Sequence, residues 1–466
     1  MRLNQLIDCC CDIEITGITT DSRKVKKGYL FIATKGFNVD HYDFIDDAIK
    51  KGAAAVIVDR EGDFSVPTIH VSDINQSLVS VCESFYNVSS SDFSFIGITG
   101  TDGKTTTAIM VRNLLNSFIP TAYIGTNGVY CGDNIYTISN TTPCVEELYH
   151  LFSVVKRHKC KVIVMEVSSE ALLHHRVDSI LFKVVAFTNI TEDHLNIHKT
   201  LDNYRECKFR LAELCSSNAL VFINGDDDNC QLLPVNSKIC YGFSDVNQYV
   251  ISDVEECQEN VIFTVSCHDK KYFFCSPFLG IYNIYNVTLA WLIARVFVPF
   301  DDKLIALIST LPNILGRREL FSDIRGFDIL LDYAHTEYAI LNLLQSLTNY
   351  RRIIVVTGAA GGREVEKRSH IGDVLFQYAD YIIFTMDDPR YEDSKKIAND
   401  MIGNHATDKF VFIRNRDCAI AFAFQYAKKG DVVAVIGKGR DNYMAIEDRR
   451  DSYCDYDVIM KYMKKS

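Results

Sequence analysis

The segment Gly100-Thr101-Asp102-Gly103-Lys104-Thr105-Thr106 has the residue types of a loop that binds phosphate. A β-branched and aromatic run precedes it, and a helix-like stretch from Thr106 to Leu115 follows, so the loop's N–H groups would lie at a helix N-terminus that stabilises anions. Lys104 is placed to pair with the terminal phosphates and Thr105 to reach Mg²⁺. An ordinary glycine turn is the alternative, and the adjacent Gly-Lys-Thr disfavours it.

Glu166 ends the apolar run 161–165, which is typical of a buried parallel strand. Its carboxylate would therefore emerge at the carboxyl edge of the sheet beside the phosphate loop, where open α/β sheets bind ligands. Magnesium is the natural partner of a carboxylate there.

Lys208 interrupts an otherwise apolar helical face formed by Leu201, Tyr204, Leu211 and Cys215. Such a lysine usually extends its amine to water. His194 is an isolated histidine. Most isolated histidines have a structural role and do not bind a metal, so a structural role is the ordinary interpretation.

Apolar runs bounded by turn residues predict the strands that position these side chains. They occur at 29–33, 54–58, 93–99, 161–165, 184–187, 329–331, 353–356, 381–384 and 432–436. The polar stretch 87–92 is predicted to be a linker, and the last four runs, separated by helix-length segments, indicate a separate α/β domain.

The composition favours a small-molecule partner. With 466 residues, 48% of them hydrophobic, the chain can build two or three cores. Its net charge of −11 argues against nucleic acid or an anionic membrane surface as a partner. No signal peptide or membrane-spanning segment is predicted, and sixteen Cys without a CxxC pair indicate reduced thiols in a cytoplasmic protein.

A short phosphate loop, Gly-Thr-x-Gly-Lys-Thr, replaces the usual Walker A spacing, since Ile98 stands where the first glycine is expected. Together with further motifs it resembles the Mur ligases and their relatives, the folylpolyglutamate synthetases. These motifs are Thr20-Asp21-Ser22-Arg23, Gly36-Phe37-Asn38-Val39-Asp40-His41, Thr141-Thr142-Pro143, Glu166-Val167-Ser168-Ser169, Thr188-Asn189-Ile190 with Asp193-His194, Gly316-Arg317, and Asp332-Tyr333-Ala334-His335.

The resemblance implies three α/β domains with the active site between them. Residues 1–91 would bind a uridine nucleotide, residues 92–314 would form a P-loop ATPase-like parallel-sheet domain for ATP and Mg²⁺, and residues 315–466 would form a Rossmann-like domain for the incoming amino acid. A domain closure would complete the site.

The resemblance also assigns roles around ATP. Lys104, Lys208, His194 and His335 would be catalytic, Lys208 as a carbamate. The metal ligands would be Thr105, Glu166, His194 and carbamylated Lys208. The nucleotide would contact Gly100, Thr101, Gly103, Lys104, Thr105, Thr106, Asn283, Asn286, Arg317 and Asp332. Capping or turn roles are the alternative for the last four.

The implied acceptor is a UDP-N-acetylmuramoyl-dipeptide, whose D-glutamyl carboxylate is phosphorylated before an amino acid attacks. Its expected contacts are Ser22, Asp40, His41, Thr141, Thr142, Ser168, His174 and Arg176. Those of the amino acid are Arg363, Asp387, Asp388, Arg390, Gly437 and Asp441.

Asp387-Asp388-Pro389-Arg390 resembles the family's Asp-Asn-Pro-Arg motif, in which the arginine forks onto a carboxylate of meso-diaminopimelate. The resemblance therefore implies meso-diaminopimelate rather than lysine as the incoming amino acid. Asp388 and Asp441 replace the Asn and Glu of the diaminopimelate-adding pattern, and the segment 361–364 is shortened. An L-lysine-adding ligase therefore stays open, as do a folylpolyglutamate-type ligase, a silent nucleotide-binding scaffold and a general P-loop motor. A monomer is expected.

Overall fold

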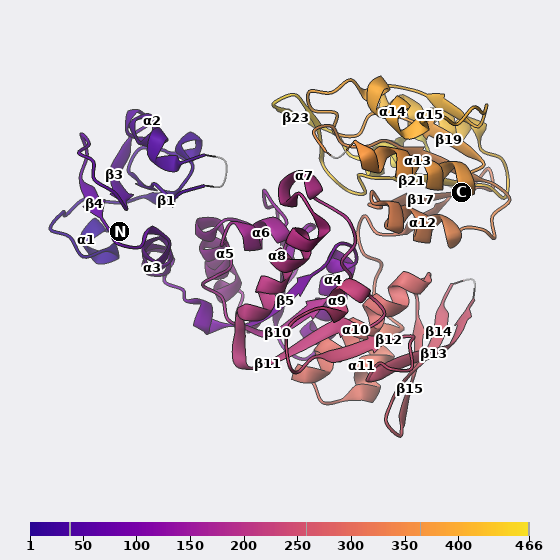
Figure 1. The fold of residues 1–466 in the computed structure, drawn as a ribbon, viewed down its shortest axis with the longest axis horizontal. Helices are drawn as coiled ribbons and strands as arrows, with labels where there is room; N and C mark the ends of the chain where they lie inside the picture. Colours follow the sequence, from indigo (N-terminus) through magenta and orange to yellow (C-terminus); the bar gives the residue numbers. More distant parts are fainter. Residues whose placement is uncertain (37–38, 258, 364, 465–466) are drawn as a thin grey trace.

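The computed structural model describes residues 1–36, 39–257, 259–363 and 365–464. Phe37 and Asn38 of the predicted uridine motif, and Glu364 of the shortened segment, lie outside them. The described residues form three successive units, each built on one main sheet (Figure 1). The boundaries drawn at 91/92 and 314/315 stay a prediction.

The N-terminal unit has a parallel sheet in the order β1-β2-β3-β4. Its elements are α1 (Leu3–Leu6), β1 (Gly17–Thr19), η1 (Ser22–Lys24), β2 (Tyr29–Ile32), η2 (His41–Phe44), α2 (Ile45–Lys50), β3 (Ala53–Val58), β4 (Thr68–His70), α3 (Ile74–Tyr86) and η3 (Ser90–Asp92). Side chains alternate between the two faces of a strand, so Phe31 and Val56 pack toward α2, whereas Leu30 and Ile57 face α1 and α3. The predicted strands at 29–33 and 54–58 are confirmed.

Residues 87–92, which join this unit to the central one, are fixed by side-chain contacts with the central unit. η3 carries Asp92, which pairs with Lys156 at 2.7 Å, and Ser90 Oγ donates to Ser179 O at 2.9 Å. One hydrophobic core also runs from the N-terminal sheet through α3 to α5 and the central sheet. The stretch 87–92, predicted to be a linker, is thus a fixed connection.

The central unit contains, among the residues described, an eleven-stranded sheet in the order β15-β14-β13-β12-β11-β10-β5-β9-β6-β7-β8. Its strands are β5 (Ser94–Thr99), β6 (Thr121–Gly125), β7 (Gly128–Cys131), β8 (Asn134–Tyr136), β9 (Val162–Glu166), β10 (Phe182–Phe187), β11 (Cys215–Asn224), β12 (Ile239–Gly242), β13 (Tyr249–Glu256), β14 (Val261–Cys267) and β15 (Lys270–Ser276). The middle strands are parallel, whereas β7, β8, β14 and β15 add antiparallel edges that were not predicted.

Helices cover both faces of this sheet, and α4 and α10 pack together on one of them. They are α4 (Lys104–Asn116), α5 (Val145–Arg157), α6 (Ser169–Leu173), α7 (Leu195–His198), α8 (Leu201–Glu213), α9 (Asp228–Gln231), α10 (Ile281–Phe297) and α11 (Asp301–Ile308). α8 ends before Cys215, so the predicted helical face through Cys215 is too long: Cys215 begins β11.

The C-terminal unit has a sheet in the order β16-β17-β21-β18-β19-β20, parallel except for β16. Its elements are β16 (Glu319–Ser322), β17 (Asp328–Asp332), α12 (Glu337–Gln345), β18 (Ile353–Thr357), α13 (Glu366–Tyr378), β19 (Tyr381–Phe384), α14 (Ser394–Ile402), β20 (Phe410–Phe412), α15 (Arg416–Tyr426), β21 (Val432–Ile436), β22 (Tyr443–Ile446), β23 (Arg449–Ser452) and α16 (Asp455–Tyr462). The four predicted strands are confirmed here, and both faces of the sheet carry separate cores.

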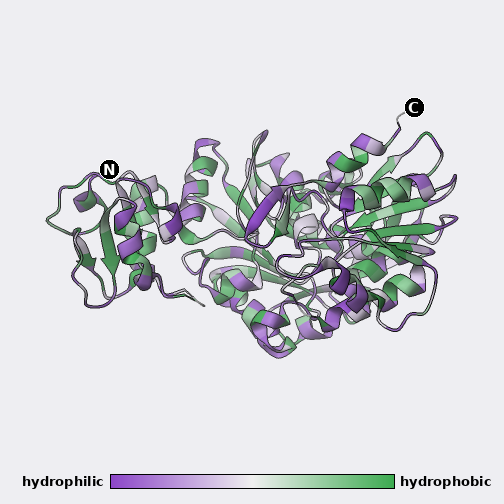
Figure 2. Ribbon diagram, turned by 90° about the horizontal axis from the view of Figure 1, so that it is seen from above, coloured by the Kyte–Doolittle hydropathy of each residue, from purple (hydrophilic) through white to green (hydrophobic). Residues whose placement is uncertain are grey.

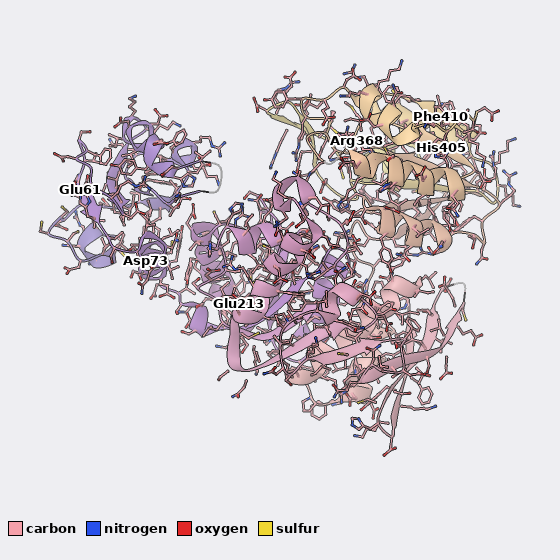
Figure 3. The ribbon with its side chains drawn as sticks, viewed as in Figure 1. Glu61, Asp73, Glu213, Arg368, His405 and Phe410 are labelled. Atoms are coloured by element: carbon pink, nitrogen blue, oxygen red, sulfur yellow. The ribbon has the colours of Figure 1, made fainter. Side chains whose placement is uncertain are left out.

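The sheets are the most hydrophobic parts of the ribbon, while polar residues concentrate on helix surfaces and loops (Figure 2). Glu61 and Asp73 of the N-terminal unit lie at the opposite end of the molecule from Arg368 and Phe410 of the C-terminal unit (Figure 3). No helix in the described ranges is long and apolar enough to cross a membrane.

Candidate active site

The phosphate loop joins β5 to α4 as predicted. Gly103 precedes α4 with φ of 83° and approaches Asn286 so closely that a Cβ atom would meet its Oδ1 at 2.5 Å. Glycine is therefore required at this position. Lys104 Nζ donates to the carbonyls of Gly100 and Thr101 at 2.9 and 2.7 Å, which keeps its ammonium over the loop.

Glu166 lies at the carboxyl end of β9, next to β5, and is fully buried. Its Oε2 accepts a hydrogen bond from Thr105 Oγ1 at 2.9 Å, and its Oε1 accepts from Thr126 N at 2.9 Å. The tyrosine hydroxyl of Tyr123 also donates to Oε1. The structure thus brings the two predicted Mg²⁺ ligands, Thr105 and Glu166, into direct contact.

Lys208 of α8 is 1% exposed and donates to Gly100 O at 2.7 Å. Its Nζ lies 4.4 Å from the centre of the Tyr204 ring. Burial, and then the nearby ammonium of Lys104, lower the pKa of Lys208 well below its usual range. The amine is therefore placed beside the phosphate loop, where its neutral form is easier to reach than in an exposed lysine.

His194 precedes α7 in the left-handed conformation, with φ of 55°. Burial lowers the pKa of His194 to about 3, so its imidazole is neutral at physiological pH, the form that binds metal. Arg363 Nη1 of the C-terminal unit lies 3.2 Å from His194 Nδ1, and Lys367 Nζ lies 2.5 Å from Asp193 Oδ1. Two cations of one segment therefore meet two neighbouring residues of the central unit.

The oxygen atoms of Thr105 and Glu166 fit Mg²⁺, a hard cation that takes oxygen ligands and keeps several waters. The described residues hold no group of three or more His, Cys, Asp or Glu side chains that could enclose a metal. One or two protein ligands completed by nucleotide phosphates are the usual arrangement for Mg²⁺ in phosphoryl-transfer enzymes. Thr105 and Glu166 have the chemistry for one such ion.

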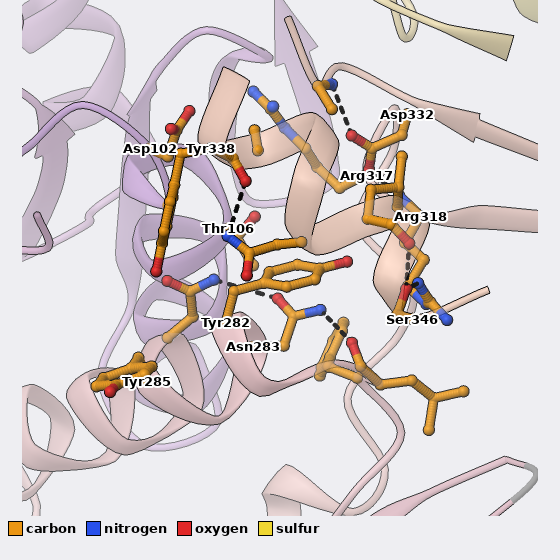
Figure 4. A pocket seen from close by; sticks show the side chains of 18 of the residues that line it. Asp102, Thr106, Tyr282, Asn283, Tyr285, Arg317, Arg318, Asp332, Tyr338 and Ser346 are labelled. Atoms are coloured by element: carbon orange, nitrogen blue, oxygen red, sulfur yellow. Dashed lines mark hydrogen bonds between the residues drawn. The ribbon is translucent and has the colours of Figure 1, made fainter. Parts of the chain in front are cut away.

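A cavity of about 1130 Å³ opens beside the phosphate loop between the central and C-terminal units. Figure 4 shows Tyr285 and Tyr338 at one side of it, Arg318 and Asp332 at the other, and Tyr282 between them. The volume slightly exceeds the usual range of small-molecule pockets, about 300–1,000 Å³. An aromatic wall beside a phosphate loop suits a nucleotide base.

Asn283 and Asn286, predicted on the adenine side, lie on α10 at this cavity. Asn283 Nδ2 donates to Leu279 O at 2.8 Å, and Asn286 Nδ2 donates to Asn283 Oδ1 at 3.1 Å. Asn286 Oδ1 also accepts from Thr107 of α4 at 3.2 Å. The two amides therefore fix α10 to the helix that follows the phosphate loop.

Arg317 and Asp332 connect the C-terminal unit to the loop. Arg317 Nη2 donates to Thr105 Oγ1 at 3.0 Å, and its guanidinium lies 4.6 Å from the centre of the Tyr333 ring. Asp332 accepts from the N–H groups of Arg318 and Ala334 at 2.7 and 2.6 Å. His335 also lines the cavity, although its Nδ1 is within 2.9 Å of Tyr333 O.

The predicted amino-acid contacts gather at the carboxyl edge of the C-terminal sheet. Lys438 is 1% exposed and lies 2.9 Å from Asp388, 3.8 Å from Asp387 and 3.8 Å from Asp441. Burial opposes its charge, but the three carboxylates outweigh it and raise the pKa of Lys438. Burial raises the pKa of Asp441 to about 6, although Lys438 opposes this shift.

Arg390 follows this group in a left-handed conformation, with φ of 52°, and is exposed. Its backbone pairs with Ala445 and Glu447 at 3.0 and 2.9 Å, which fixes the turn. Within the described chain its guanidinium forms no ion pair. Arg363 lies apart from the carboxylates, against His194.

The predicted muramoyl-peptide contacts surround Glu166. Thr142 Oγ1 donates to Glu166 O at 2.8 Å and accepts from Ser168 N at 3.1 Å, while Arg176 Nη1 donates to Thr142 O at 3.0 Å. Thr141 Oγ1 lies 3.1 Å from Thr126 Oγ1, which bonds Glu166. His174 is half-buried, and its pKa is lowered, first by burial and then by Arg176.

The predicted uridine contacts lie in the N-terminal unit, far from the phosphate loop along the molecule (Figure 1). Ser22 is buried in η1, its carbonyl accepting from Lys51 Nζ at 3.2 Å. Asp40 pairs with Arg60 at 2.8 Å, and His41 Nδ1 lies 3.0 Å from Thr34 Oγ1. The sequence predicted that Ser22, Asp40 and His41 belong to one unit. The structure leaves them separate from the other clusters of predicted site residues.

Several lining residues were missed. Tyr282, Tyr285 and Tyr338 line the cavity, yet tyrosines in helical segments are also typical of an ordinary core. Arg318 follows the predicted Arg317 directly and also lines the cavity, where its Nη1 contacts Ser346 Oγ at 2.5 Å. Only its position beside Arg317 could have pointed to it.

Comparison with known proteins gives consistent matches along the chain. Residues 14–92 match the model "Mur ligase family, catalytic domain", residues 98–294 the model "Mur ligase middle domain" and residues 316–439 the model "Mur ligase, glutamate ligase domain".

Individual relatives match over the full length. A protein of Caldanaerobacter subterraneus subsp. tengcongensis, named UDP-N-acetylmuramoyl-L-alanyl-D-glutamate–2,6-diaminopimelate ligase, is 34% identical over 468 residues, covering 98% of this chain and 96% of its own. A Bacillus cereus protein of the same name is 32% identical over 478 residues, covering 98% and 97%. A solved structure titled with the same ligase name is 26% identical, with a TM-score of 0.66 and coverage of 99% and 98%.

Proposed function

The chain belongs to the Mur ligase family, and from that membership we propose that it adds meso-2,6-diaminopimelate to UDP-N-acetylmuramoyl-L-alanyl-D-glutamate, with ATP, in peptidoglycan synthesis. The observation that carries the proposal is the direct bonding of Thr105 to both Glu166 and Arg317. It connects the phosphate loop, a predicted metal ligand and the C-terminal unit at one point.

ATP is assigned to the cavity between the central and C-terminal units. Its base would lie among Tyr282, Tyr285 and Tyr338, and its terminal phosphates at the phosphate loop and Lys104. Thr105 and Glu166 would hold Mg²⁺, which neutralises charge on the phosphates when bound. Arg317 would add a second positive charge from the C-terminal unit.

The reaction begins with transfer of the γ-phosphoryl group of ATP to the D-glutamyl carboxylate, which gives an acylphosphate and ADP. The amine of the incoming amino acid then attacks the acyl carbon, and the C–O bond to phosphate breaks to give an amide and inorganic phosphate. Lys104 would stabilise the charge that develops on the transferred group. Thr142, Ser168 and Arg176 would orient the acceptor beside Glu166.

Lys208 is proposed to act as a carbamate. Carbamylation requires a neutral amine to attack carbon dioxide, and burial already lowers the pKa of Lys208. The product is an anion within reach of the phosphate loop, because Lys208 Nζ bonds Gly100 O at 2.7 Å. His194, neutral and close to Tyr204, would be a ligand of the second metal ion.

The incoming amino acid is assigned to the carboxyl edge of the C-terminal sheet. Arg390, without an ion pair among the described residues, can receive a carboxylate, and the group of Asp387, Asp388 and Asp441 around Lys438 has excess negative charge for an amine. Diaminopimelate carries both functions at its distal end, whereas lysine carries an amine alone. All sixteen cysteines are free thiols, which supports our placing of the reaction in the cytoplasm.

A phosphate-release assay with defined substrates tests the proposal. ATP hydrolysis is expected only when the UDP-linked dipeptide and diaminopimelate are both present, with the UDP-linked tripeptide as product by mass spectrometry. Equal hydrolysis with a folate substrate would favour the folylpolyglutamate-type alternative. Nucleotide binding without product under any condition would favour the scaffold.

A further inference from the structure

Asp387 has an unusual environment at the carboxyl end of β19. It is 8% exposed, and no hydrogen bond to its carboxylate is found in the described ranges. Its nearest partners are Lys438 Nζ at 3.8 Å and Arg416 Nη1 at 3.9 Å. A Cβ atom on Gly437 would collide with Asp387 Oδ2, so this position requires glycine. The carboxylate is closely confined but not yet fully paired.

Arg416, the first residue of α15, is the other half of this arrangement. Its Nε and Nη2 donate to the two oxygens of Asp455 at 2.8 Å each, and both side chains are inaccessible to solvent. Its Nη1 has no hydrogen-bond partner in the described part of the chain, although it is buried. A buried donor without a partner is costly, and Asp387 Oδ2 lies 3.9 Å from this one.

Arg416 also reaches the second loop of the site. Its Nη2 donates to Ile436 O at 2.8 Å, and Ile436 is the last residue of β21, directly before the segment from Gly437 to Asp441. One guanidinium therefore contacts the start of α16, the end of β21 and the carboxylate beyond β19. It therefore lies between the two loops that carry the expected amino-acid contacts.

We propose that Arg416 is a positioning residue for the incoming amino acid, holding the Asp387 carboxylate and the Gly437–Asp441 loop at the spacing that receives the substrate. This inference rests on the proposed ligase function. Binding of the substrate amine draws Asp387 into place, and the gap between Arg416 Nη1 and Asp387 Oδ2 closes to a hydrogen bond. Such tightening on binding is common for site groups that are loosely paired beforehand.

A second Arg–Asp ion pair in the same sheet provides a control that distinguishes a positioning role from a general contribution to stability. Arg352 donates to Asp431 from Nη2 at 2.7 Å and from Nε at 3.2 Å, and Asp431 is fully buried. This pair lies just before β18 and β21, at the opposite edge of the sheet from the site. Arg352 is 24% exposed and Asp431 also pairs with Arg351 at 2.7 Å, so Arg352→Lys weakens a less buried Arg–Asp pair of the same sheet without touching the two loops.

The test compares Arg416→Lys with Arg352→Lys in the full-length enzyme. Arg416→Lys is expected to raise KM for diaminopimelate about tenfold or more, the effect typical of a lost supporting contact, with KM for ATP and for the UDP-linked dipeptide within about twofold. Arg352→Lys is expected to lower Tm with all three KM values unchanged. Equal effects of the two variants, or equal rises in all three KM values, would overturn the proposal.

Two further variants keep the proposal open to disproof. If Arg416→Lys does not fold, Asp455→Asn replaces it in the test, since this variant keeps Arg416 but weakens its ion pair with Asp455. A selective rise in KM for diaminopimelate supports the positioning role, and an unchanged KM rejects it. A double-mutant cycle with Asp387→Asn should be non-additive in KM, whereas additivity would contradict a shared role. Wild-type enzyme that ligates no amino acid would refute the proposed function instead, before any variant is compared.

Discussion

Arg363 Nη1 of the C-terminal unit lies 3.2 Å from Nδ1 of His194 in the central unit, across 169 residues of sequence. Lys367, in the first turn of α13, pairs with the neighbouring Asp193. Thr336 Oγ1 also donates to Asp102 of the phosphate loop at 2.9 Å. These contacts dock the C-terminal unit on the elements that carry the predicted metal and phosphate ligands.

The contacts between the C-terminal and central units predict that weakening them lets the two units separate. Lys367→Glu opposes Asp193 with a like charge, so the C-terminal unit should separate and the radius of gyration in X-ray scattering should increase. Lys395→Glu makes the same charge change on the exposed side of α14 and serves as the control. The same scattering profile for Lys367→Glu and wild type would show that the ion pair does not hold the units together.

Lys208→Ala is expected to reduce ligation at least about a hundredfold, since it removes the group proposed to become a carbamate. Added formate or acetate should restore part of the activity by supplying a carboxylate in the space left beside Gly100. Thermal unfolding checks that the variant is folded. Near wild-type turnover in a folded variant would rule out the carbamate.

Arg390 should set the choice of amino acid. We expect kcat/KM for meso-diaminopimelate to exceed that for L-lysine about tenfold or more, the value of one charge-assisted contact near 1.4 kcal/mol. Arg390→Ala should bring the two values together. Arg414→Ala, an exposed arginine after β20, is the control. A preference for lysine, or an unchanged ratio in Arg390→Ala, would remove Arg390 from the specificity site.

Asp441 predicts a pH dependence of stability. Its pKa is raised to about 6 in the folded state, so the folded protein binds this proton more tightly than the unfolded chain does. The stabilisation is fully present below about pH 4 and is lost as the pH rises through 6, by about 3 kcal/mol in all. Asp441→Asn should therefore gain stability relative to wild type between pH 4 and 8. The difference in Tm at the two pH values measures this, and a constant difference would contradict it.

The local chemistry of the site was predictable because it depends on short-range rules. A strand, a glycine loop and a helix follow one another in sequence, and the carboxyl ends of parallel strands meet at one edge, which brings Glu166 to Thr105. Asp387 and Asp388 after β19 and Gly437 after β21 lie at one edge in the structure for the same reason.

Contacts between units were not predictable in this way. Arg363 is predicted beside the amino acid, but its contact with His194 was not foreseen, because the relative placement of two sheets depends on packing that no local pattern encodes. Arg416 begins the mostly apolar helix α15, and only the fold reveals that it is buried against Asp455. The antiparallel edge β13-β14-β15 was missed as well, since short alternating runs resemble irregular loops.

The fixed joint at 87–92 has a consequence for substrate length. The N-terminal sheet shares one core with the central sheet, and Lys156 and Ser179 secure the connection, whereas the C-terminal unit has cores of its own. On the proposed assignment, the uridine end and the reacting carboxylate are held by parts that do not move apart, so this half of the enzyme acts as a molecular ruler. A peptide one residue too long or too short would misplace its carboxylate by up to about 3.5 Å, too far for in-line transfer. A precursor whose peptide has the wrong length would then be rejected because its carboxylate does not lie where the phosphoryl group is transferred.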